Sequence, residues 1–349
     1  MKVLTNASFY GTGSSAVTDL LSEYDCVRFY NNYEIRFLHD PDGVSDLEFN
    51  LVECHNRHSS GFALKRFIRL VHFLADDPKK RYETCFNGRF RSLAKQYIDN
   101  LVDFKYRGWW FYDAYDGRGF FRYYSTMSFR KFIRMISGNN LDIFPSEITY
   151  CSHPTPEKFL RETQSFIRNL CRAANPEDLP FVSFDQIVPS QNISRILRYF
   201  LDEVFVFVVY RDPRDLFLCS KYFWKERIIP FDDVYAFCKW YRYALESGSP
   251  ETLDLSHVKR IHFEDLIYRY DSLVQEIENF VGLKTANHTK KFTLFNPLRS
   301  VVNTRLWERY GTPEEISIIE SELPEYLYDF DAVKANKVPG VPITKTDVF

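Results

Sequence analysis

Short apolar segments alternate along the chain with stretches whose apolar residues recur at helical spacing. The segment from Val204 to Tyr210 is apolar on both faces, which is typical of a central parallel strand covered by helices. Further strands are predicted at Val3 to Phe9, Glu34 to Leu38, Phe181 to Phe184 and Val258 to Phe263. This alternation predicts an α/β fold with a parallel central sheet flanked by helices, whose ligands bind beyond the carboxyl ends of the strands.

Helix-start signals follow two of the predicted strands. Ser14 and Ser15 are good opening residues for a helix after the first strand. Asp212 and Pro213 suit the cap and the first position of a helix after the central strand. A later helix is predicted to end near Gly282, because glycine accepts the left-handed conformation that commonly closes a helix.

Composition excludes several classes of protein. The net charge of −2 gives no global attraction to nucleic acid or to anionic membranes, so any anion site must be local. The seven cysteines show neither a CxxC pair nor a zinc spacing, which favours reduced thiols, no metal and a cytoplasmic location. The first strand begins almost at Met1, leaving no room for a signal peptide, and no apolar run is long enough for an integral membrane segment.

Two motifs stand where a predicted strand becomes a predicted helix. Residues 10–15 read YGTGSS, a turn whose backbone N–H groups and helix dipole favour an anion. The alternative is a plain tight turn with glycines at positive φ. Residues 211–215 read RDPRD, and an ordinary helix cap explains Asp212 and Pro213. It does not explain Arg211, which puts positive charge at an already positive helix end. A bound anion would remove this conflict, so the pair of motifs predicts a ligand with two phosphate-like groups.

These residues resemble the cofactor motifs of sulfotransferases that use 3′-phosphoadenosine-5′-phosphosulfate (PAPS). The family's 5′-phosphosulfate loop, PKSGTTWL, is matched by YGTGSSAV at residues 10–17, and its RxPRDxxxS motif by residues 211–215. Segments 258–266 (VKRIHFEDL), 276–283 (EIENFVGL) and 295–307 are similar to later family segments. The resemblance covers about residues 1–50 and 180–330. It implies a P-loop-like sulfotransferase fold and sulfuryl transfer from PAPS, without a metal, to a hydroxyl of a carbohydrate, lipid or sterol-like acceptor.

The resemblance also implies which residues contact the cofactor. They are Gly11, Thr12, Gly13, Ser14, Ser15, Arg211, Cys219, Ser220, Lys290 and Lys291. Two positions depart from the family pattern: Gly11 stands where the family has a lysine or arginine, and Cys219, next to Ser220, stands where it has a serine. Because a donor to the reacting group is typically worth ~3 kcal/mol, another cation should replace the missing one. The candidates are Lys65 and Arg66, slightly ahead of Arg36, and Lys290 or Lys291.

The reaction needs a base for the acceptor hydroxyl, and the resemblance points to Glu34. The segment YEIRFL at residues 33–38 is similar to the family's KExxFF context, with Tyr33 in place of lysine. A solvent-facing glutamate in a short strand is the alternative. The rival bases are His39, His55 and His58. Asp185 and Gln186, after the strand at Phe181, either face the pocket or cap a helix.

Residues 60–150 are expected to form a helical, aromatic-rich insertion on the acceptor side of a single domain over residues 1–333, with a loose tail at 334–349. Aromatics and arginines are mixed at 107–115 and 118–124, which suits a helical core or an acceptor cavity. Single-stranded nucleic acid is a further possible occupant that the nearly neutral charge disfavours. Two alternative functions remain: a catalytically silent nucleotide-binding protein, favoured by Gly11, and a P-loop phosphotransferase, disfavoured because no lysine follows Gly13. The oligomeric state is left open.

Overall fold

The structure is a computed structural model that describes residues 1–30, 34–79, 81–108, 119–143, 147–248 and 256–333. The chain forms two compact units. The first unit combines residues 1–36 with residues 171–349, and the second is residues 37–170. The second unit is therefore wider than the expected insertion at 60–150. Tyr33, the aromatic stretch 109–118 and the tail 334–349 lie outside the described residues.

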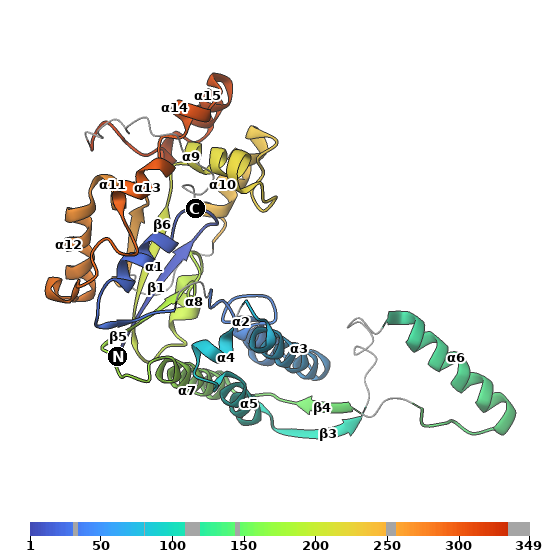
Figure 1. Ribbon diagram of the computed structural model, residues 1–349. Coiled ribbons are helices and arrows are strands. Elements are labelled where there is room, and N and C mark those ends of the chain that lie inside the picture. Colours follow the sequence, from blue (N-terminus) through green and yellow to red (C-terminus); the bar gives the residue numbers. More distant parts are fainter. Residues whose placement is uncertain (31–33, 80, 109–118, 144–146, 249–255, 334–349) are drawn as a thin grey trace. The chain divides into compact units, whose positions relative to one another are not determined.

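A five-stranded parallel sheet forms the centre of the first unit (Figure 1). Its strand order is β2-β5-β1-β6-β7, which confirms the predicted α/β fold. The strands are β1 (Lys2–Ser8), β2 (Val27–Arg28), β5 (Phe181–Asp185), β6 (Glu203–Tyr210) and β7 (Val258–His262). The residues of β6 from Val204 to Val209 are all buried, because helices cover both faces of this central strand.

The strand predicted at Glu34 to Leu38 is wrong beyond its first residue. Glu34 forms an isolated parallel bridge to Asp185, and the chain then turns. The successive side chains Phe37 and Leu38 are both buried, which a half-exposed strand does not allow. The turn closes where the Gly43 N–H donates to the Asp40 carbonyl at 2.8 Å.

Strands β1 and β6 lie side by side and end together, with Ser8 opposite Val209. The chain leaving β1 proceeds to β2 at one edge of the sheet, whereas the chain leaving β6 proceeds to β7 at the other edge. The two connections therefore diverge and leave a crevice beyond the strand ends. In open α/β sheets this topological switch point is where ligands bind.

The helices of the first unit begin and end largely as their sequence signals predict. Asp212 caps α9 by accepting a hydrogen bond from the Arg214 N–H at 2.9 Å, and Pro213 follows in the first turn. Gly282 closes α12 in the left-handed conformation at φ 81°. The helices are α1 (Ser15–Ser22), α8 (Ile193–Leu197), α9 (Pro213–Leu218), the π-helical η3 (Cys219–Trp224), α10 (Val234–Glu246), α11 (Asp265–Tyr268), α12 (Tyr270–Val281), α13 (Pro297–Ser300), α14 (Trp307–Tyr310) and α15 (Pro313–Glu322), with short 3₁₀ turns η4 (Thr285–Asn287), η5 (Val301–Asn303) and η6 (Pro324–Tyr326).

The second unit is mainly helical, as the periodicity predicts. Its core includes Tyr97, whose ring stacks on Phe166 at 4.7 Å and whose hydroxyl lies 2.8 Å from Thr163 Oγ1. The elements are α2 (Val44–Glu48), the π-helical η1 (Phe49–Glu53), α3 (Arg57–Asp76), α4 (Tyr82–Cys85), α5 (Phe90–Leu101), the antiparallel pair β3 (Phe104–Gly108) and β4 (Glu147–Cys151), α6 (Gly119–Ser137), and most of α7 (Pro156–Ala174). Within the described ranges, no helix combines the length and apolar character needed to cross a bilayer.

Candidate functional site

The loop after β1 presents bare backbone donors at the start of α1. Tyr10, Gly11 and Gly13 adopt positive φ values of 61°, 66° and 83°. Across the described ranges, no protein group accepts a hydrogen bond from the N–H groups of residues 11–15. The buried Thr12 hydroxyl likewise has no partner there. Unpaired donors beside the positive end of a helix dipole favour an anion.

Both glycines of this loop are required by contacts with aromatic rings. A Cβ at Gly13 would lie 2.6 Å from the ring of Phe263, and one at Gly11 would lie 2.4 Å from the ring of Trp224. The second contact explains the departure from the family pattern. A lysine or arginine at position 11 is excluded while Trp224 holds its place.

Arg211 is fully buried and is bonded to protein acceptors. Its Nη1 donates to the Gly11 carbonyl at 3.1 Å, and its Nη2 donates to the Asn303 carbonyl at 2.7 Å and to Cys219 Sγ at 3.1 Å. The guanidinium also lies near the Phe263 ring, with its carbon 5.2 Å from the ring centroid. Arg211 therefore ties the loop to the segment around Asn303, and a phosphate can reach its side chain only after these contacts rearrange.

Buried carboxylates surround Arg211. Asp215 accepts hydrogen bonds from the N–H groups of Arg305 and Leu306, at 3.0 and 2.7 Å. Glu264 Oε1 accepts one from the Asp212 N–H at 2.9 Å. Burial, reinforced by the charges of Asp212 and Asp215, raises the pKa of Glu264 to about 8. Burial also raises the pKa of Asp215. Burial thus favours the protonated form of Glu264, which limits the negative charge around Arg211.

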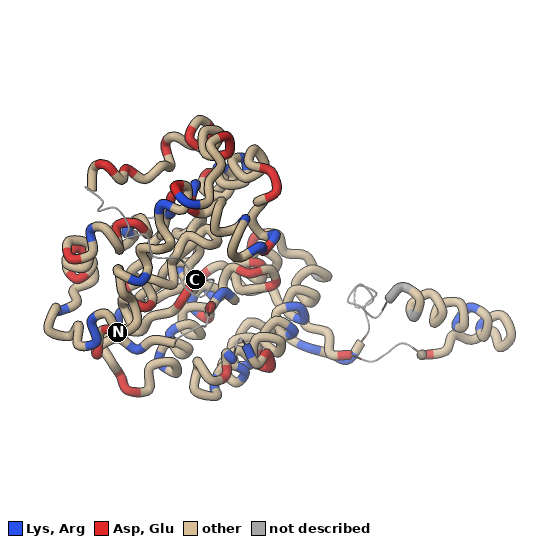
Figure 2. The backbone as a smooth tube through the Cα atoms, turned by 45° about the horizontal axis from the view of Figure 1, so that its top comes forward, with Lys and Arg blue, Asp and Glu red and all other residues tan. Residues whose placement is uncertain are grey.

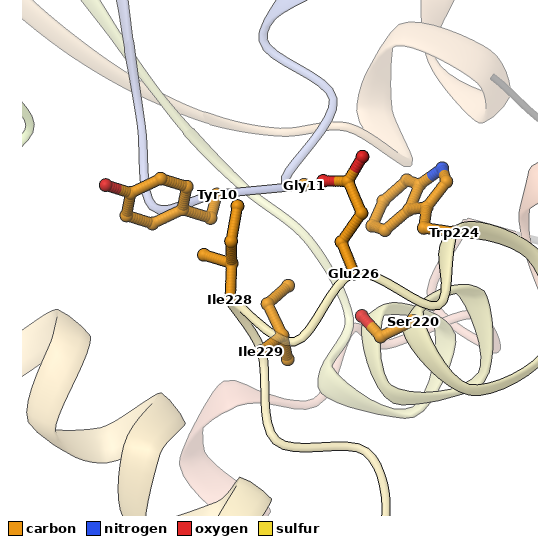
Figure 3. Close-up of a pocket in the computed structure, with 7 residues that line it drawn as sticks. All are labelled: Tyr10, Gly11, Ser220, Trp224, Glu226, Ile228 and Ile229. Atoms are coloured by element: carbon orange, nitrogen blue, oxygen red, sulfur yellow. The ribbon is translucent and has the colours of Figure 1, made fainter.

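A cavity of about 340 Å³ opens between the loop and the segment after α9 (Figure 3). Figure 3 shows the Glu226 side chain pointing toward the Gly11 backbone, between Tyr10 and Trp224. The walls combine aromatic, aliphatic and polar side chains, contributed by Tyr10, Gly11, Ser220, Trp224, Glu226, Ile228 and Ile229. Ser220 borders the cavity, and its hydroxyl donates to the Leu216 carbonyl at 2.9 Å. Cys219 is fully buried against Arg211.

Glu34 lies at the carboxyl end of β5. The Ile35 N–H donates to the Asp185 carbonyl at 2.8 Å, and Gln186 Nε2 donates to Glu34 Oε1 at 3.3 Å. Arg36 joins the same group, since its Nη1 donates to Gln186 Oε1 at 3.0 Å. Burial, with the nearby charge of Glu34, raises the pKa of Asp185 to about 7. The exposed Glu34 carboxylate therefore has a second, buried carboxyl group as its neighbour.

Asn6 connects this group to the loop. Its side-chain amide donates to the Ser14 carbonyl at 3.0 Å and to the Thr18 hydroxyl. Its backbone carbonyl accepts from the Gln186 N–H at 3.2 Å. The Arg36 guanidinium lies 5.9 Å from the Tyr10 ring centroid. Glu34 and Arg36 are thus held beside the loop by strand β1 and the end of β5.

The structure does not bring Lys290 and Lys291 to the loop. The Lys290 N–H donates at 3.2 Å to the carbonyl of Glu23, which lies just past the carboxyl end of α1, whereas the loop is at the opposite end. The Lys291 ammonium lies 3.3 Å from Asp271. Their positions suit a surface role beside α12.

The other cation candidates and the rival bases belong to the second unit. Lys65 pairs with Glu147 at 3.6 Å, and Arg66 pairs with Asp42 at 2.5 Å. His39, His55 and His58 lie in the same unit, and the His55 ring stacks on that of His153 at 3.8 Å. Of the cation candidates, Arg36 is the one with a contact to a loop residue among those described.

Three residues of the site escaped the sequence analysis: Asn6, Trp224 and Glu226. Trp224 and Glu226 follow α9 without any motif, and only the folded chain brings them to Gly11. Asn6 offered a weak signal, because asparagine is uncommon inside a strand. A buried amide in a strand next to a loop usually has a hydrogen-bonding task.

The chain is similar in structure to a known protein. No family model matches the chain, and no curated protein matches it. Among solved structures, the chain is similar to the sulfotransferase domain from the Synechococcus PCC 7002 olefin synthase, at 11% sequence identity and a TM-score of 0.40 over 95% of each chain. In the described ranges, no group of three or more His, Cys, Asp or Glu side chains is arranged to hold a metal ion.

Proposed function

We propose that this chain is a sulfotransferase that transfers a sulfuryl group from PAPS to a hydroxyl of a carbohydrate, lipid or sterol-like acceptor. The observation that carries the proposal is the 3.1 Å hydrogen bond from Arg211 to the Gly11 carbonyl. It joins the two motifs that resemble the sulfotransferase cofactor motifs, at the switch point of a parallel sheet.

The loop residues fit an anionic donor. The N–H groups of residues 11–15 and the Thr12 hydroxyl lack protein partners among the described residues, so a phosphate or sulfate group would satisfy donors that are otherwise unpaired. The adjoining cavity of about 340 Å³ offers the Trp224 ring as a stacking surface for a base. PAPS would supply the activated sulfuryl group.

The chain's own residues would do three things. The loop N–H groups would meet the negative charge that develops on the departing phosphate oxygen. Arg36, next to Tyr10, would add the positive charge that Gly11 cannot carry. Glu34 would accept the proton of the acceptor hydroxyl, with Gln186 holding its carboxylate and Asp185 holding the adjacent backbone in place.

A catalytically silent nucleotide-binding protein is the second candidate. It is favoured by the Trp224 ring, which excludes a cation from position 11, and by the three protein acceptors that engage Arg211. In this case the anion site would remain and the transfer step would be lost.

Thermal unfolding with adenosine 3′,5′-bisphosphate tests the proposal. We expect saturating bisphosphate to raise Tm, since a ligand at 100 times its Kd adds about 2.7 kcal/mol to the free energy of unfolding, and ATP to act more weakly. Lys291→Ala, at the far end of α1, is the matched control and should keep the full shift. An unchanged Tm in the wild-type protein would show that the two-anion site is wrong.

Transfer of labelled sulfate from PAPS to a panel of alcohols, glycans and lipids separates the two candidates. Labelled product with any of these acceptors supports the sulfotransferase. A bisphosphate shift without product, across the panel, favours the silent binding protein.

A further inference from the structure

Helix α6 (Gly119–Ser137) displays large apolar side chains to solvent. Phe121 is 87% exposed, Met135 75% and Ile136 67%. Successive residues of an α-helix are rotated by about 100° around its axis. On this geometry, six exposed apolar side chains of α6 fall within one arc of about 140° of the helix surface. They are Phe121, Tyr124, Phe129, Phe132, Met135 and Ile136.

The arc, which also contains Ser125 and Ser128, is exposed, whereas an ordinary surface helix buries its apolar side. Tyr123, Thr126, Arg130 and Ile133 are half-buried and lie on the opposite side of the same helix. Soluble proteins seldom leave six large apolar side chains together in water, because each loses about 1.5–3 kcal/mol of burial free energy. Such a face indicates a binding surface.

The charge of α6 points to the chemistry of the partner. The sequence from residue 119 to 137 contains no Asp or Glu, while Arg122, Arg130, Lys131 and Arg134 are basic. Figure 2 shows basic residues and no acidic ones along this helix. Arg130 and Arg134 project opposite the apolar face, and Lys131 lies at its edge. The whole chain carries −2, so this positive charge is local.

We propose that α6 binds the surface of an anionic lipid membrane, with its apolar face inserted at the boundary between headgroups and acyl chains. An amphipathic helix with aromatic residues on one face and basic residues on the other is the pattern that binds anionic bilayers in the interface plane. Long basic side chains reach from such a helix to the headgroups. A second copy of α6 fits less well, because two such helices carry the same positive charge and no acidic partner residues.

This surface is independent of the nucleotide site. The proposal stands whether or not the chain transfers sulfuryl groups, and the bisphosphate effect on Tm serves as a check that a variant is folded. An interfacial helix would also keep the enzyme close to acceptors that reside in a membrane.

Flotation of the full-length protein with lipid vesicles tests the proposal. We expect binding to phosphatidylcholine vesicles that contain phosphatidylglycerol, weaker binding to phosphatidylcholine alone, and loss of binding at high salt. The double variant Phe132→Glu/Ile136→Glu should weaken binding ~10-fold or more, since it replaces two inserted side chains by charges. Phe132→Leu should retain it.

The matched control is Thr126→Glu/Ser137→Glu, which makes the same charge change on the opposite side of the helix. A clearly smaller loss of binding in this control than in the Phe132/Ile136 variant supports the assigned face, since glutamates near Arg130 and Arg134 weaken only the contacts with anionic headgroups. Equal loss in both variants would overturn it, because binding would then follow net charge alone. Absence of wild-type binding to the anionic vesicles would overturn the proposal. It would also be overturned if the wild-type protein were a dimer, the Phe132/Ile136 variant were a monomer, and both bound vesicles equally well.

Discussion

The guanidinium of Arg211 donates a 3.1 Å hydrogen bond to the carbonyl of Gly11, 200 residues earlier in the chain. The same side chain bonds the Asn303 carbonyl at 2.7 Å, so one buried cation holds three distant segments together. In this conformation Arg211 therefore holds the loop at Gly11 in place.

We expect Arg211→Ala to lower the free energy of unfolding by about 3 kcal/mol or more in the absence of any ligand, because it removes the positive charge near Asp215 and leaves the Gly11 and Asn303 carbonyls without their donor. Urea unfolding measures this. Arg227→Ala is the control, since Arg227 is an exposed residue paired with Asp232 at 2.6 Å and should cost less than about 1 kcal/mol. A stable Arg211→Ala protein that merely binds bisphosphate poorly would instead indicate a direct phosphate contact.

Gly11→Ala should destabilise the protein more than Gly88→Ala. Both glycines have positive φ, at 66° and 70°, but a Cβ at Gly88 meets nothing within 4 Å, whereas one at Gly11 meets Trp224. We expect ~1 kcal/mol for Gly88→Ala from backbone strain and ~1–3 kcal/mol more for Gly11→Ala from overpacking. The additional loss should largely vanish in the Trp224→Ala background. Additive losses in that double mutant would contradict the contact.

The buried carboxyl of Glu264 should make the protein less stable as pH rises. Its pKa is raised from 4.5 to about 8 in the folded state, so between these values the folded protein holds a proton that the unfolded chain has released. The free energy of unfolding therefore falls with pH, by up to about 1.4 kcal/mol per pH unit from this group, and levels off above the folded pKa. Glu264→Gln should flatten this slope in unfolding measured from pH 5 to 8. The exposed control Glu314→Gln should not, and equal slopes in all three proteins would refute the assignment.

Glu34→Gln should lower turnover by ~10²–10⁴-fold while the bisphosphate effect on Tm remains, because the amide keeps the hydrogen bond to Gln186 but accepts no proton. Glu226→Gln is the matched variant, because the Glu226 side chain points toward the Gly11 backbone. Loss of turnover in Glu226→Gln with normal turnover in Glu34→Gln would transfer the role of base to Glu226.

Arg36→Ala should lower kcat by ~10²–10³-fold with little change in bisphosphate affinity, as expected for a donor that acts on charge developing in the transition state. Arg36→Lys should recover part of the loss. Lys65→Ala and Arg66→Ala, which break the pairs with Glu147 and Asp42, are the comparison variants. A loss confined to one of these two would show that the second unit supplies the cation.

Local sequence signals determined the strands and helix starts that frame the site. The apolar run from Val204 to Tyr210 predicts β6, and Asp212 with Pro213 predicts the start of α9, because burial and capping depend on neighbouring residues in the chain. The same reasoning failed for Glu34 to Leu38. There, the packing of Phe37 and Leu38 outweighs the strand propensity of the segment.

The tertiary structure alone determined which groups the site residues contact. The sequence by itself placed Gly11 and Arg211 at the ends of two strands. The ring of Trp224 against Gly11 comes from a segment with no motif, and no sequence signal connected the Asn303 carbonyl with Arg211. Such contacts depend on how the loops after different strands pack over the sheet edge, and that packing leaves no periodicity in the sequence. The chain's pattern thus specifies a parallel sheet with a glycine-containing loop after its first strand, while long-range packing directs the buried arginine toward protein acceptors.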